Sequence, residues 1–194
     1  MDPLADQAAA GARVQPAALS ASGIMHYTAP QLRQSTANIL TDIGWFAATF
    51  HVPQHQSLVD FLAGGVGVIK ATRVRIPNEE SRLPFVGIRR DAILLVEPTQ
   101  GDELIETAGS IGRTSAHQVG CLLPEGLLRG TLEVLVNVRV SDFLRQQPNL
   151  VVLRDCRLAG YGETADSPKA RKIRVALVNV GRITGVSEWE NKSV

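Results

Sequence analysis

The residues with the strongest potential for chemistry are the histidines and cysteines. His51 and His55 stand four positions apart, and on a helix this spacing would place both rings on one face, where they could bind a metal ion. Pro53 lies between them, where a strand is expected to enter a turn, so the shared face is lost and no metal site is predicted. Cys121 and Cys156 lack the spacing of metal ligands and are expected to be buried free thiols, with a disulfide between neighbouring strands as the alternative.

No catalytic or cofactor site is predicted either. The sequence contains no Gly-x-Ser-x-Gly, His-Glu-x-x-His or phosphate-binding Gly-x-x-x-x-Gly-Lys-Ser/Thr motif, and no nucleophile stands beside a base. The glycine-rich stretch 64–67 lacks the third glycine and the following helix of a nucleotide-binding loop, so we interpret it as a turn and a strand bulge. The protein is therefore expected not to be an enzyme.

Clusters of basic residues are the best candidates for a binding surface. If Arg89, Arg90, Arg171, Lys172 and Arg174 converge on one rim, they could follow the phosphates of a nucleic acid. Acidic residues are interspersed with these clusters, the net charge is only +1, and aromatic residues make up only 5% of the chain, so bases would find few stacking surfaces. Because mixed charges more often form a solvated face or ion pairs between subunits, nucleic-acid binding is the second of two hypotheses.

The overall composition is typical of a folded, soluble protein. Of the 194 residues 44% are hydrophobic. No apolar run approaches the roughly 20 residues needed to cross a bilayer. The N-terminus has no basic segment followed by an apolar core, so no secretory signal is predicted and a cytoplasmic location is expected.

An internal duplication defines the architecture. Residues 45–76 and 127–158 align without a gap at an offset of 82 residues, and residues 86–96 align with residues 176–186 at an offset of 90. The first alignment contains a repeated motif, in which Asp60, Phe61 and Leu62 recur as Asp142, Phe143 and Leu144. A unit of this length is a small domain used twice, because solenoid repeats have periods of about 20–50 residues.

Each copy is predicted to contain five short strands and one turn of helix. Hairpins are expected to turn at Asp42-Ile43-Gly44 and at Pro124-Glu125-Gly126, and Ser57 is expected to cap the helical turn of the first copy. The second copy is expected to end in a hairpin between residues 173–180 and 182–186. Short, bent strands cannot bury themselves in a flat sheet, whereas closure into a small barrel removes exposed edges and gives one core.

The predicted fold is therefore mainly β, with two tandem five-stranded barrels that follow a flexible N-terminal arm. Residues 1–22 are rich in alanine without periodicity, so this segment should be flexible unless a partner holds it. The expected parts are the arm (1–34), the first barrel (35–98), a linker (99–114), the second barrel (115–188) and a C-terminal tail (189–194).

Several stretches resemble the signatures of the Sm-like fold, a small SH3-like β-barrel. Residues 130–133 (GTLE), followed by residues 148–156 (PNLVVLRDC), resemble the first signature, in which a glycine and a hydrophobic residue precede an asparagine and a leucine-rich third strand. Residues 178–186 (VNVGRITGV) and 88–96 (IRRDAILLV) resemble the second signature, the tight turn between the fourth and fifth strands. The repeated Asp-Phe-Leu turn also resembles an uncharacterised bacterial family of small β-barrel proteins.

The resemblance implies open edges at the fourth and fifth strands, through which such barrels add neighbours and form rings. In RNA-binding members it also implies a uridine pocket. The pocket residues depart from the pattern here: Gly67 stands where the second copy has Asn149, and both last turns lack the usual Arg-Gly pair. The helical turn of the second copy would also place Phe143 and Leu144 over the position of the pocket.

Two functions from different classes follow. The first is a non-enzymatic assembly, scaffold or accessory subunit. It would bind a protein partner, a larger complex or a second copy of itself through its sheet edges and its arm, residues 1–34. The second is a Sm-like module that binds RNA or another nucleic acid through the basic residues named above.

Overall fold

The computed structural model describes residues 31–65, 67–77, 79–80, 82–99, 112–147, 149–163 and 167–189. The fold is mainly β, as predicted. The first half, residues 32–98, contains β1 (Leu32–Thr41), β2 (Gly44–Pro53), α1 (Leu58–Ala63), β3 (Val68–Arg75), β4 (Arg82–Arg89), a 3-10 turn (Arg90–Ala92) and β5 (Ile93–Pro98). The second half, residues 114–188, contains β6 (Thr114–Leu123), β7 (Gly126–Leu135), α2 (Val140–Gln146), β8 (Leu150–Ala159), β9 (Arg171–Asn179), a 3-10 turn (Val180–Arg182) and β10 (Gly185–Glu188). Most of the predicted arm, linker and tail lies outside the described residues.

Two predicted hairpins are confirmed, and a glycine closes each. β1 and β2 pair along their whole length, and Gly44, at φ +109°, stands opposite Thr41. β6 and β7 pair in the same way, with Gly126 opposite Leu123. Gly126 has a φ of +147°, and a Cβ atom there would lie 2.0 Å from the carbonyl oxygen of Ala159, so only glycine fits.

The repeated motif forms the two short helices. Ser57 caps α1 as predicted, because its hydroxyl oxygen accepts a hydrogen bond from the Asp60 amide (3.0 Å) and donates one to the Asp60 carboxylate (2.6 Å). No helix among the described residues is long and apolar enough to span a membrane. The apolar residues of the motif hold each helix on its core: Leu62 and Leu144 are buried, and Phe61 and Phe143 are half-buried.

All ten strands form one antiparallel sheet, in the order β10-β6-β7-β8-β9-β5-β1-β2-β3-β4. The expected pair of separate closed barrels is not confirmed by this order, because β5 pairs with β9 through Leu95–Val178 and Val96–Leu177. The predicted hairpin at the end of the chain is wrong. β9 pairs with β8 and β5, whereas β10 pairs with β6, because the 3-10 turn between them redirects the chain to the opposite edge of its half.

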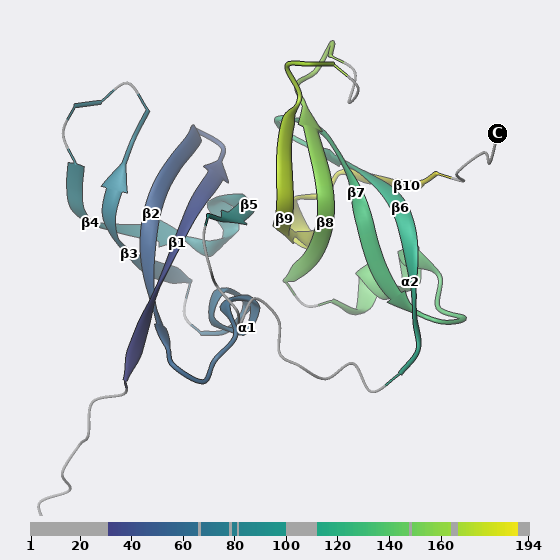
Figure 1. Cartoon of the computed structure of the whole chain (residues 1–194), viewed down its shortest axis with the longest axis horizontal. Coiled ribbons are helices and arrows are strands. Elements are labelled where there is room, and N and C mark those ends of the chain that lie inside the picture. The colour runs from purple at the N-terminus through teal and green to yellow at the C-terminus, as the bar shows by residue number, and fades with distance from the viewer. Residues whose placement is uncertain are drawn as a thin grey trace, which may run out of the picture.

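The two halves repeat each other element by element. β1, β2 and β3 begin 82 residues before β6, β7 and β8, and β4 ends 90 residues before β9. Both halves have the same strand order, β5-β1-β2-β3-β4 and β10-β6-β7-β8-β9. In Figure 1 they stand side by side as two curved sheets, with β5 and β9 meeting at the centre. The duplication seen in the sequence therefore extends to the fold.

Each half has its own hydrophobic core, and the cores exchange residues at the junction. The core of the first half, which contains Phe50 and Leu58, also contains Leu177 of β9. The core of the second half contains Leu94 and Leu95 of β5. Leu95 and Leu177 are completely buried, and burial of one leucine stabilises a fold by roughly 1.5–3 kcal/mol. The junction is therefore apolar at its centre.

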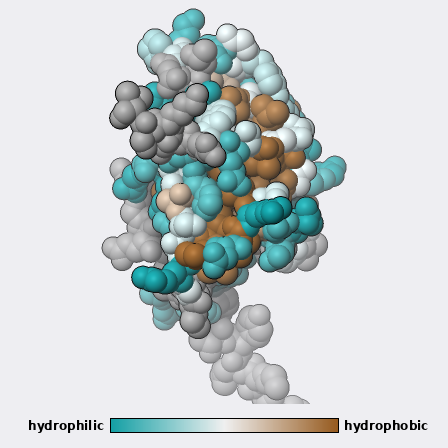
Figure 2. Space-filling model, turned by 90° about the vertical axis from the view of Figure 1, so that its right-hand side faces the viewer, coloured by the Kyte–Doolittle hydropathy of each residue, from teal (hydrophilic) through white to brown (hydrophobic). Residues whose placement is uncertain are grey.

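The sheet ends in two open edges. β4 and β10 each pair with one neighbour among the described strands. Val186 on β10 is 39% exposed, whereas its counterpart at the junction, Val96, is 0% exposed. Phe85 on β4 is 52% exposed, whereas its counterpart Val175 is 7% exposed. Figure 2 views the end that carries β6 and β10 and shows apolar side chains gathered there among polar ones.

Candidate functional site

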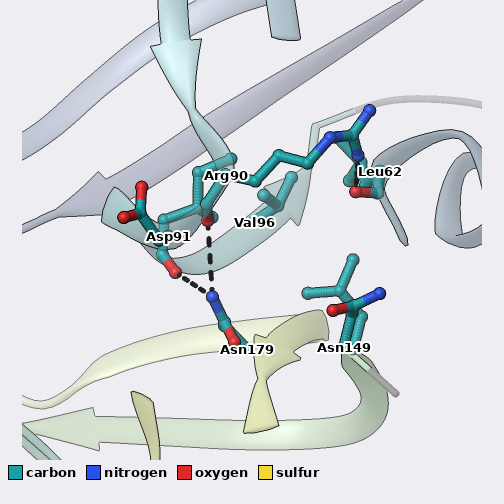
Figure 3. Close-up of a pocket in the computed structure, with 8 residues that line it drawn as sticks. Leu62, Arg90, Asp91, Val96, Asn149 and Asn179 are labelled. Carbon is teal, nitrogen blue, oxygen red and sulfur yellow. Dashed lines mark hydrogen bonds between the residues drawn. The ribbon is translucent and has the colours of Figure 1, made fainter. Parts of the chain in front are cut away.

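The junction of the two halves encloses a compact cluster of polar residues. A cavity of about 220 Å³ lies between the first 3-10 turn, α1 and the facing ends of β8 and β9 (Figure 3). Ligands often bind between units of a protein, so the hydrogen bonds decide whether these polar groups are directed at a ligand or at one another. The cavity is lined by residues of both halves: Leu62, Arg90, Asp91, Ile93 and Val96 from the first, and Asn149, Leu150 and Asn179 from the second.

Asn179 ties the second half to the first. It caps the 3-10 turn that follows β9, and its side-chain oxygen accepts a hydrogen bond from the Gly181 amide (3.0 Å). Its side-chain nitrogen donates across the junction to the carbonyl oxygens of Ile93 (2.9 Å) and Arg90 (3.4 Å), as Figure 3 shows. Both amide hydrogens are thus directed at the backbone of the other half, and the side chain acts as a clamp.

The C-terminal end of α1 is held by two further residues. The last carbonyl groups of a helix have no partner inside it. Asn149 of the second half donates to the carbonyl of Ala63 (2.9 Å), and Arg90 donates through Nη1 to those of Phe61 (3.2 Å) and Leu62. Figure 3 shows the guanidinium beside Leu62. Burial lowers the pKa of the Arg90 guanidinium from its ordinary value, but a group this basic stays charged.

A second set of contacts crosses the junction at the other end of β9. The Arg171 guanidinium donates to the Glu97 carboxylate (2.5 Å) and lies 4.1 Å from the centroid of a Trp45 ring, over its face. At the Asn179 end of β9, Arg182 in the following 3-10 turn forms an ion pair with Asp42. Charge pairs and aromatic stacking therefore support the strand pairing of β5 and β9.

The five basic residues predicted to form a nucleic-acid surface do not lie together on one free face. Arg90 and Arg171 are engaged at opposite ends of the junction. The Arg89 guanidinium, at the end of β4, pairs with the carboxylate of Asp91 in the 3-10 turn that follows. Lys172 and Arg174 are exposed on β9. Two of the five basic residues, Arg90 and Arg171, therefore bond at the junction, and the other three are exposed to solvent.

Sequence reasoning missed the ion pairs of the junction. Arg171 and Glu97 are 74 residues apart, and Arg182 and Asp42 are 140 residues apart, so no local pattern links them. The two asparagines of the junction did carry a signal, because both fall within stretches that resemble Sm-like signatures. Nothing in those stretches indicated that the asparagines would bond to the other half.

The histidines are placed by local contacts. His51 Nε2 lies 2.9 Å from the Thr72 hydroxyl, and His55 is exposed in the turn after β2. His117 Nδ1 lies 3.6 Å from the Glu188 carboxylate, a neighbour that the sequence did not reveal. The structure places no group of three or more metal-binding side chains together in the part of the chain that it describes.

Cys121 and Cys156 are free and buried, as predicted. Burial raises the pKa of Cys121 to about 11 and that of Cys156 to about 12, and the charge of Cys121 adds to the second shift. At neutral pH both are therefore thiols. Because the reactive form of cysteine, both as a nucleophile and as a metal ligand, is the thiolate, neither residue is suited to these two roles at neutral pH.

Comparison with family models, with curated proteins and with solved structures found no match to this chain. Its function is therefore inferred from geometry. The amides of Asn149 and Asn179 and the guanidiniums of Arg90 and Arg171 all bond to groups within the chain. This is the arrangement of an interface between two folded units, in which each polar group satisfies another.

Proposed function

We propose that the protein is a non-enzymatic assembly subunit, built from two tandem five-stranded Sm-like barrels, which binds its partners through the open edges of its sheet. The barrel assignment is supported by the repeated strand order, by the separate cores and by the register shift found in each half. The non-enzymatic role is supported by the junction, where the polar side chains bond to backbone carbonyl groups and to a carboxylate of the same chain.

One observation carries the proposal: β5, the fifth strand of the first half, pairs with β9, the fourth strand of the second half. The open edges are strands of the same two kinds, because β10 is a fifth strand and β4 is a fourth. A second copy can therefore add its β10 to the β4 of the first and repeat the junction between chains. Such a head-to-tail contact gives a ring if the rotation closes, and a filament if it does not.

The residues at the open edges suit this contact. Arg89, at the end of β4, occupies the place that Asn179 occupies at the end of β9. Its guanidinium can donate to the carbonyl groups of a facing 3-10 turn, as Asn179 does at the junction. Val186 and Phe85 would be covered in the contact, as their counterparts Val96 and Val175 are at the junction. Each Å² of apolar surface buried in this way would stabilise the assembly by about 25 cal/mol.

The contact between chains is expected to be weaker than the internal junction. Two ion pairs strengthen the internal contact, and the counterparts of all four of their residues are uncharged, with Ser81 in the place of Arg171. Glu97 corresponds to Ser187, Arg182 to Ala92, and Asp42 to Pro124. Association should therefore depend on protein concentration, whereas the internal junction is joined by the chain itself.

The test is the mass of the protein in solution. Light scattering should show a mass that rises with concentration to a multiple of 20.9 kDa. Val186→Lys places a charge on the open edge and should give a monomer. Val136→Lys, in the exposed turn after β7, is the matched control and should assemble normally. A monomer at every concentration, or assembly that survives in Val186→Lys, would contradict the proposal.

The arm, residues 1–34, is proposed as a second means of binding a partner protein. Its last residues, 32–34, form the beginning of β1. Deletion of residues 1–30 should abolish co-purification with a partner from the source cell, while the number of chains in the assembly of the purified protein stays the same. Unchanged co-purification would show that the arm does not bind.

Nucleic-acid binding is the second candidate, and one observation favours it. Lys172 on β9 stands opposite Arg157 on β8, and both are exposed. Two basic side chains on neighbouring strands could bind a phosphate group of a nucleic acid. A steep fall of log affinity for single-stranded RNA with log salt concentration would support this candidate, and no binding at low salt would eliminate it.

A further inference from the structure

Each half has a cavity beside its short helix, and the two cavities are built from counterpart residues. In the first half the cavity measures about 500 Å³ and is lined by residues of β1, β2, β3, α1 and the first 3-10 turn. In the second half it measures about 260 Å³ and is partly closed by Val59, which belongs to α1 of the first half. Phe61 and Phe143 line the two cavities at equivalent positions.

The two cavities differ in charge. The first is lined by His51, Lys70 and Arg90, and none of its described lining residues is acidic. At the positions that correspond to His51, Lys70 and Thr72, the second cavity has Glu133, Val152 and Arg154, so it carries one acidic and one basic residue. Because both halves have the same strands and the same register shift, the fold itself does not require these basic residues. Their presence is specific to the first half.

The basic residues are held in place around the first cavity. The Thr72 hydroxyl donates to the Thr49 carbonyl (3.3 Å), so its oxygen accepts from His51 Nε2 (2.9 Å) and fixes the imidazole ring. Arg90 is anchored at the end of α1 by the carbonyl oxygens described above. The Lys70 ammonium lies 5.1 Å from the centroid of the Phe85 ring.

Exposed apolar side chains stand beside these charges. Leu32 is 52% exposed and Val68 is 57% exposed, and both line the cavity with the half-buried Phe61. The counterpart of Val68 in the second half, Leu150, is only 9% exposed and belongs to the core at the junction. A ligand that covers Leu32 and Val68 would remove apolar surface from water. The positive charge of Lys70 would favour a ligand that is negatively charged.

The geometry points to a binding site for an anionic amphiphile: a carboxylate or phosphate head that meets Lys70 and Arg90, on a short apolar group that covers Leu32 and Val68. A cavity of about 500 Å³ is within the range of small-molecule sites, which are mostly apolar with a few placed polar groups. The cavity is lined by no described residue of β4 or β10, so binding of its ligand is tested separately from assembly through those edges.

Isothermal titration calorimetry with decyl phosphate, below its micelle concentration, tests the site directly. We expect binding of decyl phosphate, and much weaker binding of inorganic phosphate and of uncharged decyl maltoside. Lys70→Gln should lower the affinity about tenfold or more, the loss expected of one charge-assisted contact. Lys169→Gln removes an exposed lysine from the loop before β9 and should change nothing. Equal binding of decyl maltoside, or an unchanged affinity in Lys70→Gln, would overturn the inference.

A free amphiphile and a lipid headgroup would present the same chemistry, and a flotation experiment separates them. Vesicles of phosphatidylcholine that contain phosphatidic acid should carry the protein upward if the headgroup is the ligand. Binding of decyl phosphate without flotation assigns the site to a soluble amphiphile. If the protein neither floats nor binds decyl phosphate, the inference is wrong, whatever the mass measurements show about assembly.

Discussion

Arg73 on β3 and Asp155 on β8 occupy the same position in the two halves and share the same rare backbone conformation. Their φ angles are +52° and +50°, in the left-handed region that few residues other than glycine adopt. Each lies where the register shifts, between β2 and β3 or between β7 and β8. Because such a bulge bends a strand and increases its twist, the same bend lets each half curl around its own core.

Replacement of Asp155 tests what this bulge contributes. Asp155→Val puts a β-branched side chain on left-handed backbone and should lower the free energy of unfolding by about 1–2 kcal/mol. Asp155→Gly should be nearly neutral, because relief of strain is offset by roughly 0.5–1 kcal/mol of glycine entropy. Urea denaturation measures both. Glu133→Val, at an exposed position of β7, is the control, and equal losses in the two valine variants would show that the bulge is unimportant.

Much of each half could be predicted from the sequence, because the features that define it are local. The offset of 82 residues correctly aligned Phe50 with Leu132, and both are buried in their cores. The Ser57 cap and the two hairpins depend on contacts between residues close in the chain, so turn and capping patterns were sufficient to find them.

The single sheet could not be predicted, because it depends on contacts between distant residues. Leu95 and Val178 pair across the junction at a separation of 83 residues, and the apolar pattern of β5 suits burial against any strand. The hairpin predicted at the end of the chain failed for a related reason. The sequence of the three-residue 3-10 turn does not indicate whether the strand after it folds back on β9 or crosses to β6.

Asn179 should contribute measurably to the stability of the junction. Asn179→Asp replaces a donor with a carboxylate that faces the carbonyl oxygens of Arg90 and Ile93, so two acceptors would lose their partner. We expect the free energy of unfolding to fall by about 1–3 kcal/mol. Gln54→Ala, an exposed substitution in the turn after β2, provides the reference. If Asn179→Asp is as stable as Gln54→Ala, the clamp has no energetic role.

The two buried thiols should make stability depend on alkaline pH. An unfolded cysteine has a pKa of about 8.5, whereas burial raises the pKa to about 11 at Cys121 and about 12 at Cys156. The folded state keeps protons that the unfolded chain releases, so this contribution is complete below about pH 8.5 and is lost as the pH rises toward the folded values. The double variant Cys121→Ala/Cys156→Ala should therefore show a smaller decline of unfolding free energy across this window. A decline as steep as that of the native protein would assign it to other groups.

Arg89 distinguishes assembly through β4 from other self-association. Arg89→Asn places at the open edge the residue that holds the same place at the junction, Asn179, and should preserve assembly because an amide can donate to the facing carbonyls. Arg89→Glu removes the donor and adds a charge that repels those carbonyls, so it should give a monomer. Both variants lose the pair with Asp91, so that shared loss cannot explain a difference between them. Sedimentation velocity measures the outcome: assembly by Arg89→Glu would show that chains meet elsewhere, and dissociation of Arg89→Asn would show that the open edge does not copy the junction.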